Sequence, residues 1–331
     1  MQHKIPSQLS KRNKAVRDDD LSAPQSLPLF KIKPVRLDAT ISLKDAIDSI
    51  VSNCLEQVRG NESGVVRGND PEHVHQMRIG LRRLRLALEL FKEVFPSGMA
   101  LQEDMEWLSA ELGTSRNWDV LAFDTLKSIS KAFPEELEGL MLAAQSAAVR
   151  QRRHTALMVG SARYAQLHLK LDEWLQGMCS TDAAEPGNDK KSHQLSDVWV
   201  KKFYSHVFDR YRRKLLQRGE ALDEGDFAAM HHVRISAKKL RYTLDFFQSL
   251  PSARKARPFT SALTDLLSVL GKINDASCAD TLLRELAQLD PQVANEANFA
   301  RGYLAFQSGE NTKNIHRIWQ RFCVESALKQ G

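Results

Sequence analysis

The sequence predicts an all-α protein made of two related helical bundles. Apolar residues recur with the period of an α-helix along most of the chain, and no convincing strand alternation or hairpin signal is found. One helical segment also occurs twice, which indicates an internal duplication. With 331 residues, 42% of them hydrophobic, the chain can bury one large core or two smaller ones.

Residues 1–40 mix Pro, Ser, Lys and Asp with little periodicity, so we expect a flexible N-terminal tail. Thr40 or Ser42 can cap a first helix that runs to about residue 59. A second helix begins after Asn69-Asp70-Pro71 and ends before Pro96. The remaining helices predicted in this first bundle, which covers 41–178, lie at 99–112, 118–132, 134–158 and 161–178.

Turn-forming residues interrupt the helical pattern at 179–195, and we interpret this stretch as a linker. The second bundle then covers 196–331. Its predicted helices lie at 196–217, 226–249, 258–271, 274–289, 291–307 and 310–328. Two helical bundles packed together are the expected architecture.

The helix after Pro71 carries a basic stripe beside its apolar face. Six residues form the apolar stripe at helical spacing: Val74, Met77, Leu81, Leu84, Leu88 and Phe91. Four residues repeat this spacing one position later and form the basic stripe: His75, Arg78, Arg82 and Arg85. A second apolar stripe follows, formed by Ile79, Leu86 and Leu90. Four residues remain for the far side of the helix: Gln76, Gly80, Arg83 and Ala87.

The same helix recurs at 230–247, shifted by 156 positions from 74–91. Identical pairs include His75 with His231, Arg78 with Arg234, and Arg85 with Arg241. Arg82 and Arg83 are replaced by Lys238 and Lys239, which keeps the charge but not the side chain. A second match, 112-LGTSRNWD-119 with 270-LGKINDAS-277, follows in the same order. Two ordered matches make a duplicated unit the best explanation, with two basic helices serving one site.

The positive charge of the chain is concentrated in these two helices. The sequence has 47 Lys and Arg against 41 Asp and Glu, a net charge of +6. Residues 75–85 and 231–241 hold eight of the basic residues and no acidic ones, so 39 basic residues remain against 41 acidic ones elsewhere. A focused positive field of this kind suits an anionic partner. The alternative is a solvated face whose cations pair with nearby acids: Glu89, Asp119, Asp245 and Asp275.

Cysteine spacing and hydropathy exclude several other classes. Four cysteines (Cys54, Cys179, Cys278 and Cys323) show no CxxC spacing, which suggests a reduced cytoplasmic protein without a zinc site or a disulfide framework. No apolar run reaches the ~18 residues of a membrane span. The N-terminus lacks the apolar centre of a signal peptide. We expect no cofactor, no bound metal and no membrane association.

The duplicated pattern His-x-x-Arg-x-x-x-(Arg/Lys)-(Arg/Lys)-Leu-Arg resembles the CHAD family, the conserved histidine α-helical domain. The segment ending in Arg116-Asn117-Trp118-Asp119, with its partner Asn274-Asp275, is similar to the second signature of that family. The resemblance covers roughly residues 40–328. It implies two helical bundles related by a pseudo-twofold axis, a shared cavity lined by the basic helices, binding of inorganic polyphosphate and association with polyphosphate granules.

Eleven residues are the expected polyphosphate contacts: His75, Arg78, Arg82, Arg83, Arg85, Arg116, His231, Arg234, Lys238, Lys239 and Arg241. Arginine can bind two phosphate oxygens at once and lysine supplies a compact charge. Basic residues three or four apart recur about every 5 Å along a helix, so they can meet successive phosphates of an extended chain. Three further basic groups are expected to be solvated helix ends or to widen the positive surface: Arg152-Arg153, Arg212-Arg213-Lys214 and Arg254-Lys255.

Two alternative functions remain open at this stage. A metal-assisted phosphohydrolase would use His75 and His231, although no HxxxH motif or pair of carboxylates stands beside the basic stripe. A nucleic-acid-binding protein is favoured slightly by the sequence pI of about 9.1. Nucleic acid is the less expected partner, because few aromatic residues lie near the stripe to stack on bases. We therefore expect a binding module that is not an enzyme.

Overall fold

The computed structural model describes residues 27–38, 41–93, 100–180, 191–223, 226–250 and 257–327. These ranges contain helices and no β-strand, which confirms the all-α fold class. Residues 1–26, on which most of the predicted tail falls, lie outside them. The elements of the first half are α1 (Leu43–Gly60), α2 (Glu62–Arg67), α3 (Pro71–Phe91), α4 (Gln102–Asp119), the π-helical η2 (Val120–Thr125), α5 (Leu126–Ser130), the 3₁₀ turn η3 (Pro134–Glu136), α6 (Glu138–Val159) and α7 (Ala162–Ser180).

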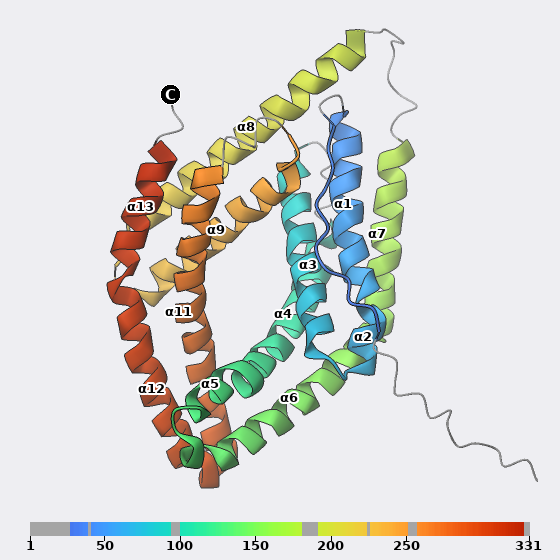
Figure 1. Ribbon diagram of the computed structural model, residues 1–331. Helices are drawn as coiled ribbons and strands as arrows, with labels where there is room; N and C mark the ends of the chain where they lie inside the picture. Colours follow the sequence, from blue (N-terminus) through green and yellow to red (C-terminus); the bar gives the residue numbers. More distant parts are fainter. Residues whose placement is uncertain are drawn as a thin grey trace, which may run out of the picture.

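The second half repeats the packing of the first. Its elements are α8 (Lys191–Gly219), α9 (Phe227–Phe247), α11 (Arg257–Leu289), the 3₁₀ turn η5 (Pro291–Val293), α12 (Ala294–Lys313) and α13 (Ile315–Ala327). α3 packs on α1 and α4, and its counterpart α9 packs on α8 and α11. In Figure 1, α1–α4 and α7 lie on one side of a central gap in the ribbon, and α9, α11 and α13 lie on the other.

The N-termini of α1 and α3 are capped by the residues that the sequence predicts. The Ser42 hydroxyl accepts the Asp45 N–H at 3.0 Å, which satisfies one of the free donors at the start of α1. The Asp70 carboxylate accepts the Glu72 N–H at 2.8 Å, and Pro71 occupies the first turn of α3. The cap on α3 fixes where the first basic helix begins.

Two of the breaks predicted between helices are absent from the structure. α11 runs without a break through Gly271, where separate helices at 258–271 and 274–289 were predicted. A glycine inside a helix costs only about 1 kcal/mol, and Leu270 and Ile273 continue the buried side of the helix on both sides of it. Likewise α4, η2 and α5 form one continuous helical segment at 102–130.

The predicted linker is shorter than expected. α7 extends to Ser180 and α8 begins at Lys191, so the two ends of the predicted 179–195 linker are helical. Residues 181–190 lie outside the described residues.

Residues 27–38 are not the flexible tail that composition suggested. The Leu37 N–H donates to the Ser249 hydroxyl at 2.8 Å, and this hydroxyl donates to the Leu37 carbonyl at 3.1 Å. Nearer the start of the segment, the Asn61 side-chain amide donates to the Phe30 carbonyl at 2.8 Å. The segment therefore connects α2 at one end with the residues after α9 at the other.

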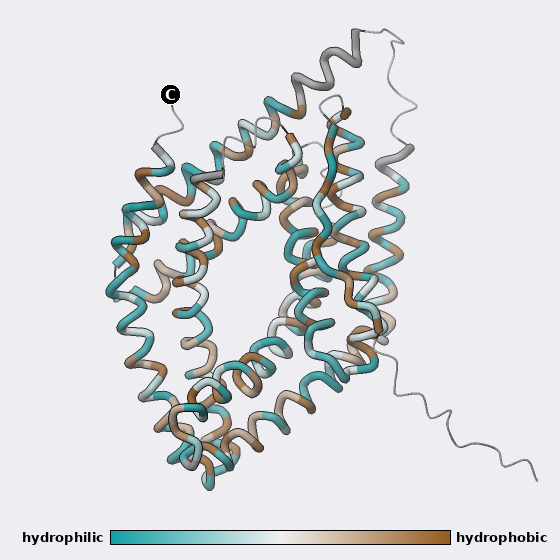
Figure 2. Tube along the Cα trace, viewed as in Figure 1, coloured by the Kyte–Doolittle hydropathy of each residue, from teal (hydrophilic) through white to brown (hydrophobic). Residues whose placement is uncertain are grey.

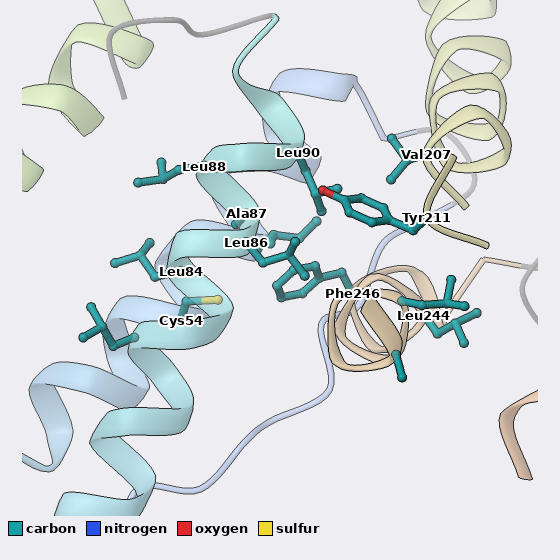
Figure 3. Close-up of a cluster of buried hydrophobic side chains, with 14 of the residues drawn as sticks. Cys54, Leu84, Leu86, Ala87, Leu88, Leu90, Val207, Tyr211, Leu244 and Phe246 are labelled. Atoms are coloured by element: carbon teal, nitrogen blue, oxygen red, sulfur yellow. The ribbon is translucent and has the colours of Figure 1, made fainter. Parts of the chain in front are cut away.

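Two hydrophobic cores are shared between the halves of the sequence. The larger core draws on α1, α3, α4 and α7 together with α8, α9, α11 and α13. The smaller one combines η2, α5 and α6 with α11, η5 and α12, which meet at the lower end in Figure 1. Figure 3 shows part of the larger core, where Leu86 and Leu90 of α3 meet Tyr211 of α8 and Phe246 of α9. The predicted boundary between the bundles therefore separates the two sequence repeats, but it does not separate the hydrophobic cores, which the two repeats share.

The helices are amphipathic along their length. In Figure 2 hydrophobic and hydrophilic residues alternate in short stretches on the helices around the central gap. Among the described helices, none has a stretch both long and apolar enough to cross a lipid bilayer.

Candidate functional site

The basic stripe is the part of α3 that the fold leaves partly open. From His73 to Phe91, all residues are buried except six: His75, Arg78, Ile79, Arg82, Arg85 and Glu89. The far side predicted for this helix is also buried, because α1 covers it: a Cβ on Gly80 would lie 3.0 Å from the Val58 Cγ2. Four predicted contact residues are thus directed away from the cores by the packing of α3.

The second basic helix has the same pattern. Val233, Ala237, Leu240 and Leu244 of α9 are buried, while Arg234, Lys238, Lys239 and Arg241 keep partial exposure and His231 is exposed. Asp226 caps the helix by accepting the Ala229 N–H at 2.8 Å. The periodicity of each stripe therefore predicted its orientation correctly.

Cations from the two stripes lie close together. Burial, followed by the charges of Arg82, Arg234 and Arg78, lowers the pKa of Lys238 to about 7. Burial, Arg82 and Arg234 together lower the pKa of Arg78 to about 9. Burial also lowers the pKa of Arg234, and Arg82 adds to the effect although Asp275 opposes it. Each helix thus adds positive charge to the other, so the stripes face a common region.

A cavity of about 710 Å³ lies between α3, α4 and α9. Its basic lining residues are Arg82, Arg85, Lys92, His231, Arg234, Lys238 and Lys239. Its apolar and aromatic lining residues are Leu86, Leu88, Met105, Ile235 and Tyr242. Gln102 and Ser109 of α4 complete the wall, and Glu89 is the one acid among the lining residues that the structure describes.

Arg78 lies against α4 beside the cavity, but it is not among the residues that line it. Its Nη1 donates to the Ser109 carbonyl at 3.1 Å. A Cβ on Gly113 would lie 2.2 Å from the same Nη1, so only glycine leaves space for this arginine. The glycine of the repeated Leu112-Gly113 segment thus has a steric reason in the first half. In the second half, Gly271 has no atom within 4 Å of its Cβ position.

The cations differ in how far acids neutralise them. Within 4 Å, Arg85 pairs with Glu106, Lys239 with Glu89, Arg241 with Asp245, and Arg234 with Asp275 at 3.8 Å. In the part of the chain that the structure describes, no acidic group lies within that distance of Arg78, Arg82 or Lys238. These three therefore form the least compensated part of the cluster.

Arg83 is separated from the other predicted contacts. It is 1% exposed, and it donates to the Gln57 Oε1 at 2.9 Å and to the Asn53 Oδ1 at 2.8 Å, both on α1. Its guanidinium also lies 5.4 Å from the centre of the Phe246 ring. The guanidinium is thus used to join α1, α3 and α9, and we remove Arg83 from the expected ligand contacts.

Arg116 lies near the basic site but lines another cavity. It pairs with Asp124 at 3.3 Å, and both line a hollow of about 580 Å³ between η2, α5, α11 and α12. Arg116 also contributes, after burial, to lowering the pKa of His75. Arg116 therefore extends the positive region beyond the main cavity, whereas the lowered pKa of His75 favours its neutral form.

Two other basic positions were predicted wrongly as solvated helix ends. Arg152 is 9% exposed and lies 3.6 Å from the Asp119 carboxylate, and burial raises the pKa of that acid to about 6. Arg212 is also 9% exposed and donates to the Ser326 carbonyl at 2.6 Å. Periodicity gave no signal for the burial of either arginine, because their partners come from distant segments. Arg254-Lys255 lies outside the described residues.

Met105 and Ser109 of α4 line the cavity, and the sequence pattern did not indicate this either.

Acidic, histidine and cysteine side chains do not gather at this site. Over the described ranges, no group of three or more of them is placed to hold a metal ion. Cys54, Cys278 and Cys323 are free thiols.

The chain is similar to known proteins in sequence and in fold. A family profile described as the CHAD domain matches residues 49–284. The crystal structure of the CHAD domain from the plant Ricinus communis is 35% identical, with a TM-score of 0.78, over 90% of this chain and 97% of that one. PptA from Streptomyces chartreusis is 16% identical with a TM-score of 0.55, over 85% and 99% of the two chains, which shows a similar fold. A search of curated proteins found no match.

Proposed function

The chain belongs to the CHAD domain family, and we propose that it binds inorganic polyphosphate, without catalysis, between α3 and α9. One observation carries this proposal. Arg78, Arg82, Arg234 and Lys238 come from two repeat-related helices and converge on one half-buried region with little acidic compensation. An anion bound there relieves the repulsion between them, whereas a cation or a neutral ligand does not.

The chemistry of the side chains fits a chain of phosphates. Arg82 and Arg234 supply planar groups that can hold two oxygens of one phosphate, and Lys238 supplies a point charge near both. Arg85 and Arg241 continue the two stripes, with Lys239 and His231 at their edges. Contacts repeat about every 5 Å along each helix, so several phosphates of one chain can be bound together.

The test is a binding titration with polyphosphates of several lengths, run at two salt concentrations. Wild-type affinity is expected to fall steeply as salt rises, because each phosphate contact releases a counterion. The double variant Arg82→Glu, Lys238→Glu should lose binding while keeping its helical circular-dichroism spectrum. The control is Lys201→Glu, Lys202→Glu, which makes the same charge change at two exposed positions on α8. Equal binding by the two double variants would place the ligand elsewhere.

Two further measurements on the wild-type chain distinguish polyphosphate binding from the two alternative functions. Displacement of polyphosphate by duplex DNA or RNA at equal phosphate concentration would favour a nucleic-acid-binding protein. Metal-dependent release of orthophosphate from polyphosphate, with Mg²⁺ or Mn²⁺ present, would favour a hydrolase. Polyphosphate binding without either result supports the proposal.

The corresponding cellular role is attachment to polyphosphate granules in the cytoplasm. A fluorescently tagged chain should co-localise with granules, and the Arg82→Glu, Lys238→Glu variant should be diffuse. A wild-type chain that stays diffuse in granule-containing cells would contradict this role.

A further inference from the structure

The cavity between α3 and α9 has two chemically different walls. One is formed by the cations Arg82, Arg234 and Lys238, and the other is apolar. Ile235 is 36% exposed although it is a large aliphatic residue, and it lies between Arg234 and the next turn of the same helix. Inorganic polyphosphate has no apolar surface with which to cover such a wall. Its binding alone leaves Ile235 in contact with water.

Tyr242 lines the same cavity as Ile235, and it is near enough to Arg78 and Arg234 to affect the pKa of both guanidinium groups. A ring in this position offers a flat face to a planar group whose phosphates lie on the cations. Leu86 and Leu88 of α3 also line the cavity.

α4 adds polar groups to the lining of the cavity. Gln102, Met105 and Ser109 lie on one face of that helix and all line the cavity. The Gln102 amide N–H donates to the Glu106 Oε1 at 2.9 Å, which leaves its carbonyl oxygen as an acceptor. A hydroxyl and an amide beside an apolar surface suit the edge of a heteroaromatic base better than they suit an alkyl chain.

We propose that this cavity binds nucleoside polyphosphates, with the phosphates on Arg82, Arg234 and Lys238 and the base against Ile235 and Tyr242. The inference rests on the proposed function in that both ligands use the same cations. A volume of about 710 Å³ lies within the range of roughly 300–1,000 Å³ that is typical of small-molecule sites. The apolar wall then discriminates between a phosphate chain with an organic end group and one without.

The experiment compares ATP with inorganic tripolyphosphate by calorimetric titration. Tripolyphosphate carries the phosphates without the base, so the two ligands separate the cationic wall from the apolar one. ATP is expected to bind the wild-type chain about tenfold more tightly, which is the effect of burying one aliphatic side chain. Ile235→Asn should remove this difference and leave the tripolyphosphate affinity unchanged within about twofold.

The matched control is Ile79→Asn. Ile79 occupies the repeat-related position on α3 and is not among the residues that line the cavity. It should leave the preference for ATP intact. Tyr242→Leu is a second test variant, and it should also weaken ATP binding more than tripolyphosphate binding.

The outcomes distinguish this inference from the proposed function. Tripolyphosphate binding with equal or weaker ATP binding, or an ATP preference that survives Ile235→Asn, overturns the inference and leaves polyphosphate binding in place. Absence of binding by tripolyphosphate and by longer polyphosphates, while ATP binds, overturns the proposed function and keeps the cavity as a nucleotide site. Absence of all binding overturns both.

Discussion

Lys238 holds its proton weakly because of where it lies. Burial acts first, and the charges of Arg82, Arg234 and Arg78 add to it, while Asp275 opposes them. With a pKa of about 7, the ammonium is protonated in acid and loses its proton as the pH rises through neutrality. An anion binds the protonated form better, so by linkage anion binding raises this pKa and affinity falls as the pH rises.

We therefore predict that polyphosphate affinity of the wild-type chain falls roughly tenfold from about pH 6.5 to about pH 8.5, the effect of losing one charge-assisted contact. Lys238→Arg should flatten this dependence, because arginine stays protonated. Titrations at both pH values with a long polyphosphate measure the effect, since its internal phosphates remain ionised throughout. A slope that is unchanged in Lys238→Arg would assign the pH dependence to another group.

Gly113 and Gly271 occupy matching positions in the repeats but have different surroundings. A Cβ at Gly113 would displace the Arg78 guanidinium, whereas Gly271 has open space. We predict that Gly113→Ala weakens polyphosphate binding several-fold, because Arg78 can no longer reach over α4. The displaced group is the end of a flexible side chain, so folding should be little affected.

Gly271→Ala is the control for this prediction. It should leave binding unchanged and raise the free energy of unfolding by up to about 1 kcal/mol, as expected for Gly→Ala inside a helix. Urea unfolding together with polyphosphate titration checks both variants. Similar binding by the two alanine variants would show that Arg78 does not depend on Gly113.

Arg82 and Arg83 show how much of the site the sequence could predict. The spacing placed Arg78, Arg82 and Arg85 on one stripe, and the structure keeps them partly open on that stripe. Periodicity predicts on which side of the helix Arg83 lies, but not which other helix packs against that side. Its partners Asn53 and Gln57 belong to another helix, so its burial could not be predicted from local sequence.

At the scale of elements, α3 is a buried helix with one partly open stripe, and Arg83 is part of its packing. We predict that Arg83→Ala lowers the free energy of unfolding by about 2–4 kcal/mol, because it leaves the buried Gln57 oxygen and the half-buried Asn53 oxygen without their donor. Polyphosphate affinity of the folded variant should remain at the wild-type level.

Lys239→Ala provides the matched comparison at the repeat-related position. Lys239 pairs with Glu89 at 2.5 Å on the partly exposed rim of the cavity, so its loss should cost at most about 1 kcal/mol. Chemical denaturation measures both variants. A loss of binding by Arg83→Ala at temperatures where it is folded would return Arg83 to the set of ligand contacts.

The repeat predicted the elements better than their boundaries. Both basic helices, and the caps of α1 and α3, follow from duplicated motifs and capping residues in the sequence, whereas the Asp226 cap of α9 was not predicted. The continuity of α11, and of α4 with α5, does not, because a single glycine is a weak helix breaker when buried residues continue on either side. α2 was missed altogether, and its six residues are too short to show a period.

For the whole molecule, duplication in sequence did not produce two independent bundles. Both hydrophobic cores combine residues from the two halves. Residues 27–38 add a further connection, with Phe30 bonded to Asn61 at one end and Leu37 to Ser249 at the other. These contacts span long sequence separations, so the sequence pattern alone gave no sign of them. Shared cores also explain how two basic helices are held facing one cavity.

The same arrangement predicts that the chain unfolds as one unit. Leu37 is 3% exposed, and Leu37→Ala should lower the free energy of unfolding by about 2–4 kcal/mol, the usual cost of removing a buried leucine side chain. Because the larger core is continuous, signals from the first half (Trp107) and from the second half (Trp319) should shift together. The exposed neighbour Arg36→Ala should change neither. Fluorescence of single-tryptophan variants during urea unfolding tests this, and separate transitions for the two tryptophans would show that the halves fold independently despite their common core.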